Sequence, residues 1–288
     1  TARSLNPKRI AVVVGHGAEE VKHACADNGI IWVFQQRQLG TGHAVSCTRE
    51  IFRGFSGDLL ILSGDVPLIS GDTLLGLLSR HREQNAALTL LTAFLEQPSG
   101  YGRILRNEKK DLLGIVEERD AAEPEKKIKE VNAGIYAVSP RFLYPALEEL
   151  KSNNRQGEYY LPDIVGIAQK SGKTVRTIRV DDAREILGIN TREELAYMEK
   201  TLQERINRKW MESGVTLKDP QTTYIDESVV IGRDTEIGPN THLLGDTVVG
   251  ENCRIDGNAY VRDSELGKGV KLKFSVVLEE CEVETMWK

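Results

Sequence analysis

The chain has 288 residues, of which 40% are hydrophobic and 28% charged, and its formal net charge is −5. This composition is typical of a soluble globular protein large enough for two domains. It argues against a nucleic-acid binder, which needs a basic surface, and no apolar run reaches the roughly 20 residues of a membrane span. With no signal-peptide pattern and no paired cysteine spacing, we expect a cytoplasmic protein with reduced thiols.

Strand-like and helix-like patterns alternate over the first hundred residues. The expected strands cover residues 10–15, 30–35, 59–62 and 87–95. The expected helices cover residues 19–29, 41–52 and 72–84. This alternation indicates βα units and an α/β fold, and it favours a parallel core.

The rhythm changes after residue 100. Two-residue alternation over 100–120 predicts a hairpin with a polar turn at 107–110, and residues 130–139 and 174–182 read as further strands. Residues 191–214 are the clearest helix in the sequence, because Thr191 and Glu194 form a capping box and Gly214 is a natural stop. We interpret it as a connecting helix.

An aliphatic residue then recurs every six positions, at Ile225, Ile231, Ile237, Leu243, Val249, Ile255 and Val261. After one missing residue the series resumes at Leu266, Leu272 and Leu278. Such hexapeptide periodicity predicts a parallel β-helix, whose coils cannot bury an apolar face alone but stack into one continuous core.

Three places in the first domain could carry chemistry. The apolar strand at 59–62 ends at Asp65, beyond the carboxyl end where ligands of α/β sheets bind, although Gly-Asp before Val-Pro is also ordinary turn chemistry. The Gly-Thr-Gly at residues 40–42 could meet a phosphate or a base edge, or simply form a turn. Asn190 could cap a helix, yet a carboxylate and an amide oxygen together suit Mg²⁺.

Seven motifs in chain order carry a resemblance to a known family: GIIWVFQQRQLGTGHA, LSGDVPLI, GYGRI, GIVEERDA, VNAGIY, GEYYLPDI and GINTREEL. With the hexapeptide repeats, they resemble the bacterial bifunctional N-acetylglucosamine-1-phosphate uridylyltransferases / glucosamine-1-phosphate acetyltransferases over nearly the whole chain. The resemblance implies a Rossmann-like pyrophosphorylase domain at 1–190, a connecting helix at 191–214 and a left-handed β-helix at 215–288. It also implies a homotrimer that assembles through the β-helix.

The resemblance implies a role for each site residue. The uridine contacts would be Gln35, Gly40 and Thr41. The nucleotide and metal loop would be Ser63, Gly64 and Asp65. The N-acetylglucosamine contacts would be Gly102, Glu117 and Asn132. Asp65 and Asn190 would share the Mg²⁺ cofactor and thereby align the reactants. Ser63 and Ala133 depart mildly from the family pattern, which leaves contact details open.

The implied reaction is transfer of a uridylyl group from UTP to N-acetylglucosamine 1-phosphate, giving UDP-N-acetylglucosamine and pyrophosphate for cell-wall precursor synthesis. The acetyltransferase activity, with acetyl-coenzyme A as substrate, would need residues beyond Lys288. The family's glycine-rich phosphate loop would precede Thr1, so we expect this chain alone to turn over little or not at all.

Two alternatives stay open from the sequence. One is another sugar-phosphate nucleotidylyltransferase with a hexapeptide tail, which would use ATP, GTP or dTTP. The other is a non-catalytic, trimeric regulatory or scaffold homologue, against which the intact Asp65 and Asn190 speak.

Overall fold

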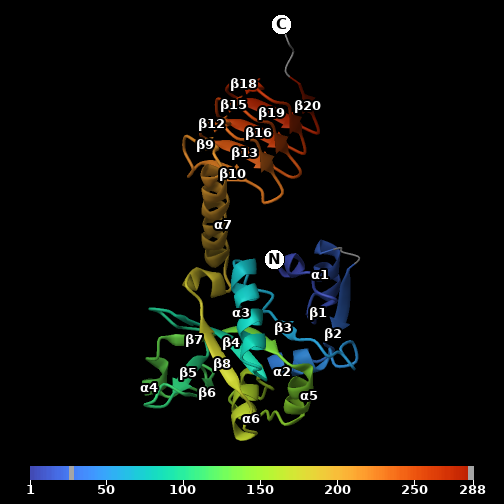
Figure 1. Ribbon diagram of the computed structural model, residues 1–288, viewed down its shortest axis with the longest axis vertical. Coiled ribbons are helices and arrows are strands. Elements are labelled where there is room, and N and C mark those ends of the chain that lie inside the picture. Colours follow the sequence, from blue (N-terminus) through green and yellow to red (C-terminus); the bar gives the residue numbers. More distant parts are fainter. Residues whose placement is uncertain (26–28, 285–288) are drawn as a thin grey trace. The chain divides into compact units, whose positions relative to one another are not determined.

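The computed structural model describes residues 1–25 and 29–284, which form two compact units divided between Gly188 and Ile189 (Figure 1). Each unit has its own hydrophobic core. Among the described helices, none combines the length and the apolar run needed to cross a membrane.

The first unit is built on a mixed six-stranded sheet and a separate two-stranded one. Its strands are β1 (Ile10–Val14), β2 (Ile30–Phe34), β3 (Leu59–Ile61), β4 (Leu88–Phe94), β5 (Arg103–Arg106), β6 (Leu112–Val116), β7 (Glu130–Val138) and β8 (Val175–Arg179). The larger sheet has the order β6-β5-β7-β4-β8, with β3 also paired to β7, while β1 and β2 pair in parallel.

The prediction of a parallel core is wrong for β7, which runs antiparallel to β3, β4 and β5. Among the described strand pairs of the larger sheet, only β4 and β8 pair in parallel, although β3, β4 and β5 all run in the same direction, opposite to β7. A parallel neighbour needs a long crossover, usually a helix. The chain instead reaches β7 through the β5–β6 hairpin and the four-residue helix α4 (Glu123–Lys126). The predicted hairpin is thereby confirmed.

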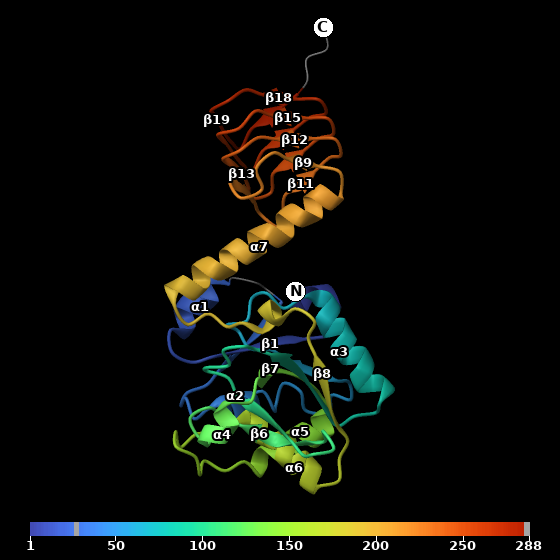
Figure 2. The ribbon, with the colours of Figure 1, turned by 90° about the vertical axis from the view of Figure 1, so that its left-hand side faces the viewer.

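Helices cover both faces of this sheet (Figure 2). The remaining helices are α1 (Ala18–Ala24), α2 (Thr41–Ser46), α3 (Gly71–Glu83), α5 (Pro140–Glu148) and α6 (Ile164–Lys170), with 3-10 turns at Ala2–Leu5, Leu161–Asp163 and Ala183–Ile186. Leu88 and Leu90 of β4 belong to the cluster that contains α5 and α6, whereas Leu91 packs with α3. Alternate residues of one strand thus serve two cores.

Two helices are shorter than the sequence pattern predicts. The helix expected over 19–29 ends at Ala24, and residues 26–28 lie outside the described part of the chain. The helix expected over 41–52 ends at Ser46 and continues as turns.

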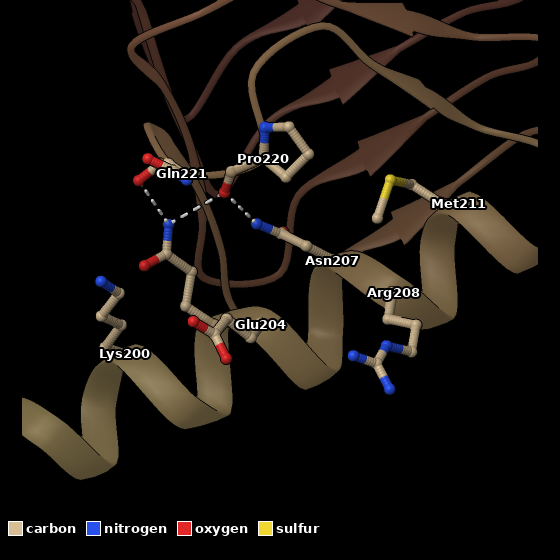
Figure 3. Close-up of a pocket in the computed structure, with 8 residues that line it drawn as sticks. Lys200, Glu204, Asn207, Arg208, Met211, Pro220 and Gln221 are labelled. Atoms are coloured by element: carbon tan, nitrogen blue, oxygen red, sulfur yellow. Dashed lines mark hydrogen bonds between the residues drawn. The ribbon is translucent and has the colours of Figure 1, made fainter.

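The second unit begins with α7 (Arg192–Glu212), where the predicted capping box of Thr191 and Glu194 is confirmed and Gly214 follows at φ 94°. Gln203 and Asn207 of this helix donate hydrogen bonds to the carbonyl of Thr223, at 2.7 and 2.9 Å, in the first coil of the β-helix. Figure 3 shows Asn207 turned toward Pro220, and its Nδ2 also donates to the Pro220 carbonyl at 2.8 Å. A pocket lies beside this bond, lined by residues of α7 and by Pro220 and Gln221.

The predicted β-helix is confirmed as three parallel sheets of short strands, in the left-handed hexapeptide architecture. The strands are β9 (Thr216–Leu217), β10 (Thr223–Ile225), β11 (Val230–Ile231), β12 (Glu236–Ile237), β13 (Thr241–Leu244), β14 (Val248–Val249), β15 (Arg254–Ile255), β16 (Ala259–Arg262), β17 (Glu265–Leu266), β18 (Lys271–Leu272), β19 (Val276–Glu279) and β20 (Glu282–Val283). The hexad aliphatics from Ile225 to Leu272 are buried in one cluster, and Leu278 packs partly against it.

Candidate active site

The turn after β2 positions the predicted uridine contacts. Gln35 is buried, and its Nε2 donates to the Gly40 carbonyl at 3.3 Å and to His43 Nδ1 at 2.8 Å. Because an amide nitrogen can only donate, the His43 nitrogen must accept. Gly40 has φ 102°, and a Cβ there would lie 2.8 Å from the Tyr159 carbonyl oxygen, so this tight turn requires glycine.

The GEYYLPDI motif lies directly on that turn. Tyr159 exchanges two backbone hydrogen bonds with it, accepting from Gly42 N at 2.7 Å and donating to the Leu39 carbonyl at 2.8 Å. Leu161 N donates to Thr41 Oγ1 at 3.0 Å. The hydroxyl of Thr41 therefore keeps its proton free to donate, and two motifs 120 residues apart form one wall of the site.

The three predicted sugar contacts are brought together at the start of β5. Asn132 N donates to the Gly102 carbonyl at 2.9 Å. A Cβ on Gly102 would lie 3.1 Å from Glu117 Oε1, so the glycine leaves room for that carboxylate. The Asn132 side chain is itself anchored, because its Nδ2 donates to Tyr136 Oη at 2.7 Å.

Acidic side chains surround Glu117. Burial and the neighbouring carboxylates of Asp163 and Asp120 raise the pKa of Glu117 above its ordinary 4.5, while Arg103 opposes them. Burial and Asp120 likewise raise the pKa of Asp163, and burial together with Asp120 raises the pKa of Tyr160 to about 12. Glu117 thus gains from any ligand that donates a hydrogen bond to its carboxylate, as a sugar hydroxyl does.

Sequence reasoning missed Asp120, Tyr136 and Asp163. Asp120 and Asp163 lie inside the motifs GIVEERDA and GEYYLPDI, and Tyr136 ends VNAGIY. Carboxylates inside such motifs are a signal that could have been followed, whereas the convergence of Asp120 and Asp163 on Glu117 becomes visible only in the fold.

The Ser63–Asp65 loop leaves β3 next to β7. Ser63 Oγ donates to the Gly134 carbonyl at 3.4 Å. Asp65 is exposed, and within residues 1–25 and 29–284 its carboxylate has no hydrogen-bond or ion-pair partner. A Cβ on Gly188 would lie 3.1 Å from Asp65 Oδ2, so the chain passes closely there.

Asn190 comes two residues after Gly188 and belongs to the second unit, so its pairing with Asp65 stays a prediction. In the described parts of the chain, no three His, Cys, Asp or Glu side chains cluster as a metal site. An uncommitted carboxylate such as Asp65 nevertheless fits Mg²⁺, which keeps several waters and takes one or two carboxylates together with substrate phosphates.

Comparison with known proteins decides the family. Residues 6–214 match the nucleotidyl transferase family. The chain belongs to that family. Residues 228–263 match the bacterial transferase hexapeptide (six repeats) family, in the region where the β-helix lies.

The curated relatives are longer proteins. The chain is 44% identical to a bifunctional protein GlmU of Pelobacter propionicus, over 98% of this chain and 62% of that protein. It is 45% identical to a bifunctional protein GlmU of Caldanaerobacter subterraneus, over 96% of this chain and 60% of that protein. The family resemblance read from the motifs is confirmed, and the chain spans about 60% of these relatives' length.

A solved structure shares the fold. A UDP-glucose pyrophosphorylase complexed with UDP-glucose matches with a TM-score of 0.51 at 16% identity, over 62% of this chain and 75% of that one. At this identity the likeness supports the architecture alone.

Proposed function

We propose that the chain provides the uridylyltransferase site of a bifunctional enzyme, which transfers a uridylyl group from UTP to N-acetylglucosamine 1-phosphate and releases pyrophosphate. One observation carries this proposal. Gly102 accepts a backbone hydrogen bond from Asn132 and lies beside Glu117, and the 158–163 segment both bonds the turn at Gly40 and carries Asp163, which acts electrostatically on Glu117.

The chemistry asks the protein to align two anions and to offset their charge. An oxygen of the sugar 1-phosphate attacks the α-phosphorus of UTP in line with the departing pyrophosphate, so no covalent nucleophile is needed. Gln35, Gly40 and Thr41 would hold the uridine, while Glu117 and Asn132 would accept from and donate to the sugar's hydroxyl and acetamido groups.

The proposed Mg²⁺ ligands are Asp65 and Asn190. Both residues are exposed, and Asn190 uses its backbone N–H, rather than its side chain, to meet Glu194 Oε2 at 2.6 Å. The carboxylate and the carboxamide oxygen are the hard donors that Mg²⁺ prefers. When bound, the ion would neutralise phosphate charge during transfer.

The β-helix would serve assembly and a second activity. Tyr224, His242, Tyr260 and Val277 occupy matching positions on one outer face, Tyr224 stacks on His242 at 4.7 Å, and Val277 is 72% exposed. Such a ladder of aromatic rings and an exposed valine supports association through the β-helix, as the proposed homotrimer requires. Sedimentation equilibrium should then give three times the 32.1 kDa chain mass, and a monomer would contradict this.

Acetylation of glucosamine 1-phosphate by acetyl-coenzyme A is the activity that the family resemblance assigns to the hexapeptide part.

The site is tested by ligand binding to the chain. Isothermal titration should show that Glu117→Ala weakens UDP-N-acetylglucosamine by roughly 5- to 150-fold, because a lost polar partner costs about 1–3 kcal/mol, and leaves UDP nearly unchanged. Glu108→Ala, in the exposed turn of the β5–β6 hairpin, is the matched control. Equal weakening of both ligands would count against the assignment, and tighter binding of an ADP- or GDP-sugar would overturn the base choice.

The metal ligands are tested separately. Added Mg²⁺ should tighten UDP-N-acetylglucosamine binding to the wild-type chain, and Asp65→Asn should abolish most of that gain, because a neutral amide holds the cation less well. An unchanged Mg²⁺ effect in this variant would remove Asp65 from the metal site.

A further inference from the structure

The strand β7 is irregular where the site residues lie. Tyr136 pairs with Leu90 and Asn132 pairs with Thr92, so four steps along β7 match only two steps along β4. The extra residues form a bulge around Gly134, whose φ is 71°. In a regular strand Asn132 and Tyr136 would be about 13 Å apart, too far for their side chains to meet.

The bulge brings these two side chains into contact. Asn132 Nδ2 donates to Tyr136 Oη at 2.7 Å, and Gly134 N donates to Asn132 Oδ1 at 3.2 Å. Because the Gly134 amide can only donate, it fixes which end of the carboxamide faces Tyr136. Among the described residues, these two bonds leave one N–H and one lone pair of the Asn132 side chain for a ligand, and Tyr136 fixes their direction.

The same bulge contacts the Ser63–Asp65 loop. Strand β4 pairs along one edge of β7. Along the other edge, β7 pairs with β3 at Tyr136 and with β5 at Val131, and the bulge lies between these two pairings. There the Gly134 carbonyl accepts from Ser63 Oγ, two residues before Asp65. Displacing the bulge would move both sides of the site.

The hydroxyl of Tyr136 is shielded and stays protonated. The residue is 1% exposed, and Asn132 is 7% exposed. Burial, with the nearby carboxylates of Glu117 and Asp163, raises the pKa of Tyr136 well above its ordinary 10, although the bond from Asn132 opposes this. The oxygen that holds Asn132 is therefore a neutral acceptor at every physiological pH, and it lies close to the second sugar-selecting side chain, Glu117.

We propose that Tyr136 is a positioning residue for sugar recognition: through its bond to Asn132 it locks the β7 bulge and fixes the carboxamide that reads the N-acetylglucosamine group. This inference rests on the proposed function, whose site it deepens. Because Tyr136 is buried, it would act on the sugar through Asn132 rather than by direct contact.

The test removes one oxygen atom. Tyr136→Phe keeps the ring and deletes the acceptor, so Asn132 can rotate away. Isothermal titration should show roughly a five- to tenfold loss of UDP-N-acetylglucosamine affinity, the size of one hydrogen bond, and less than a twofold change for UDP. Tyr144→Phe is the matched control. It also deletes a buried tyrosine hydroxyl, but this one bonds Thr48 Oγ1, at 3.0 Å, and not Asn132.

A double-mutant cycle separates positioning from general stability. In an Asn132→Ala background, Tyr136→Phe should change UDP-N-acetylglucosamine affinity by less than twofold, because the group it positions is gone. Additive losses, equal losses for UDP, or a wild-type affinity in Tyr136→Phe would overturn the inference.

The two proposals fail differently. If the wild-type chain binds UDP-N-acetylglucosamine and Glu117→Ala weakens it, but Tyr136→Phe does not, only the positioning role falls. If the wild-type chain binds UDP-N-acetylglucosamine no better than UDP, and Glu117→Ala changes nothing, the proposed function falls and takes the positioning role with it.

Discussion

In the β-helix each coil repeats the one before it, whereas in the first unit every candidate site residue lies where a regular element is interrupted. Gln35 follows β2, Asp65 follows β3, and Glu117 follows β6. Gly102 precedes β5, and Asn132 lies at the bulge of β7. Regular repetition stabilises a solenoid, while ligand groups come from places where backbone pairing stops and side chains and amides remain free.

This difference predicts that damage to the β-helix core lowers stability without changing the site. Leu243 is fully buried, so Leu243→Ala should cost about 2–5 kcal/mol in the unfolding of the second unit. Denaturant unfolding followed by circular dichroism measures this, with the exposed Lys271→Ala as control. A change in UDP-N-acetylglucosamine affinity of the folded Leu243→Ala chain would break the comparison.

The irregular unit should be sensitive at its bulge. Gly134→Ala forces a side chain into φ 71° and places its Cβ 2.8 Å from Ser63 Oγ, so we expect a loss of about 1–3 kcal/mol in the unfolding free energy of the first unit. UDP-N-acetylglucosamine affinity should fall as well.

Gly166→Ala is the matched control for Gly134→Ala. Gly166 lies inside α6 with open space where its Cβ would be, so the same substitution should stabilise the chain by roughly 0.5–1 kcal/mol. If thermal unfolding shows that both variants behave alike, the bulge is not the constrained element that we describe.

A local cap should matter less than either core or bulge. Thr191 Oγ1 accepts from Glu194 N at 3.1 Å at the start of α7, so Thr191→Ala should lower the free energy of unfolding by about 1 kcal/mol. Thr191→Ser keeps the hydroxyl and should keep most of this stabilisation. Urea titration of both variants compares them, and equal losses would mean that the hydroxyl does not act as a cap.

The smallest effect concerns the charge of Glu117. Its folded pKa is raised, so the folded state holds a proton that the unfolded state has already released. Stability should therefore fall as pH rises from 4.5 through the raised pKa, by less than 1.36 kcal/mol per pH unit. Glu117→Gln should lose this part of the slope, leaving the contribution of Asp163, whose pKa is raised too.

The affinity for the sugar nucleotide should show the opposite trend in the same pH window. UDP-N-acetylglucosamine affinity should weaken as pH falls and Glu117 becomes protonated, because the carboxylate then loses acceptor strength. In Glu117→Gln the UDP-N-acetylglucosamine affinity should vary much less with pH in this window, because only Asp163 still titrates beside the sugar. A wild-type affinity that does not vary with pH would indicate that the carboxylate does not meet the sugar.

The sequence predicted the two units unequally. Hexad aliphatics such as Ile237 are enough to place every coil, because each coil contacts only its neighbours. In the first unit the strands were predicted, but the direction of β7 was not, since the pattern of apolar residues does not encode which partner a strand finds. Gly134 inside the strand pattern VNAGIY was the available sign of a bulge.

The candidate site residues were proposed from motif order rather than from first principles, and their roles stay a prediction. The contact of Gly102 with Glu117 and Asn132 joins residues from different elements, and only the fold reveals it. The hydrogen bond between Asn132 and Tyr136 was missed because a tyrosine in a strand normally indicates core packing, and this bond depends on the bulge.

A crystal structure of the chain with UDP-N-acetylglucosamine and Mg²⁺ is the most direct test of the central claim. We expect the acetamido sugar against Glu117 and Asn132, the uracil at Gln35 and Gly40, and the ion about 2.1 Å from an Asp65 oxygen. A sugar nucleotide bound elsewhere, or bound here with its sugar turned away from Glu117 and Asn132, would contradict the account.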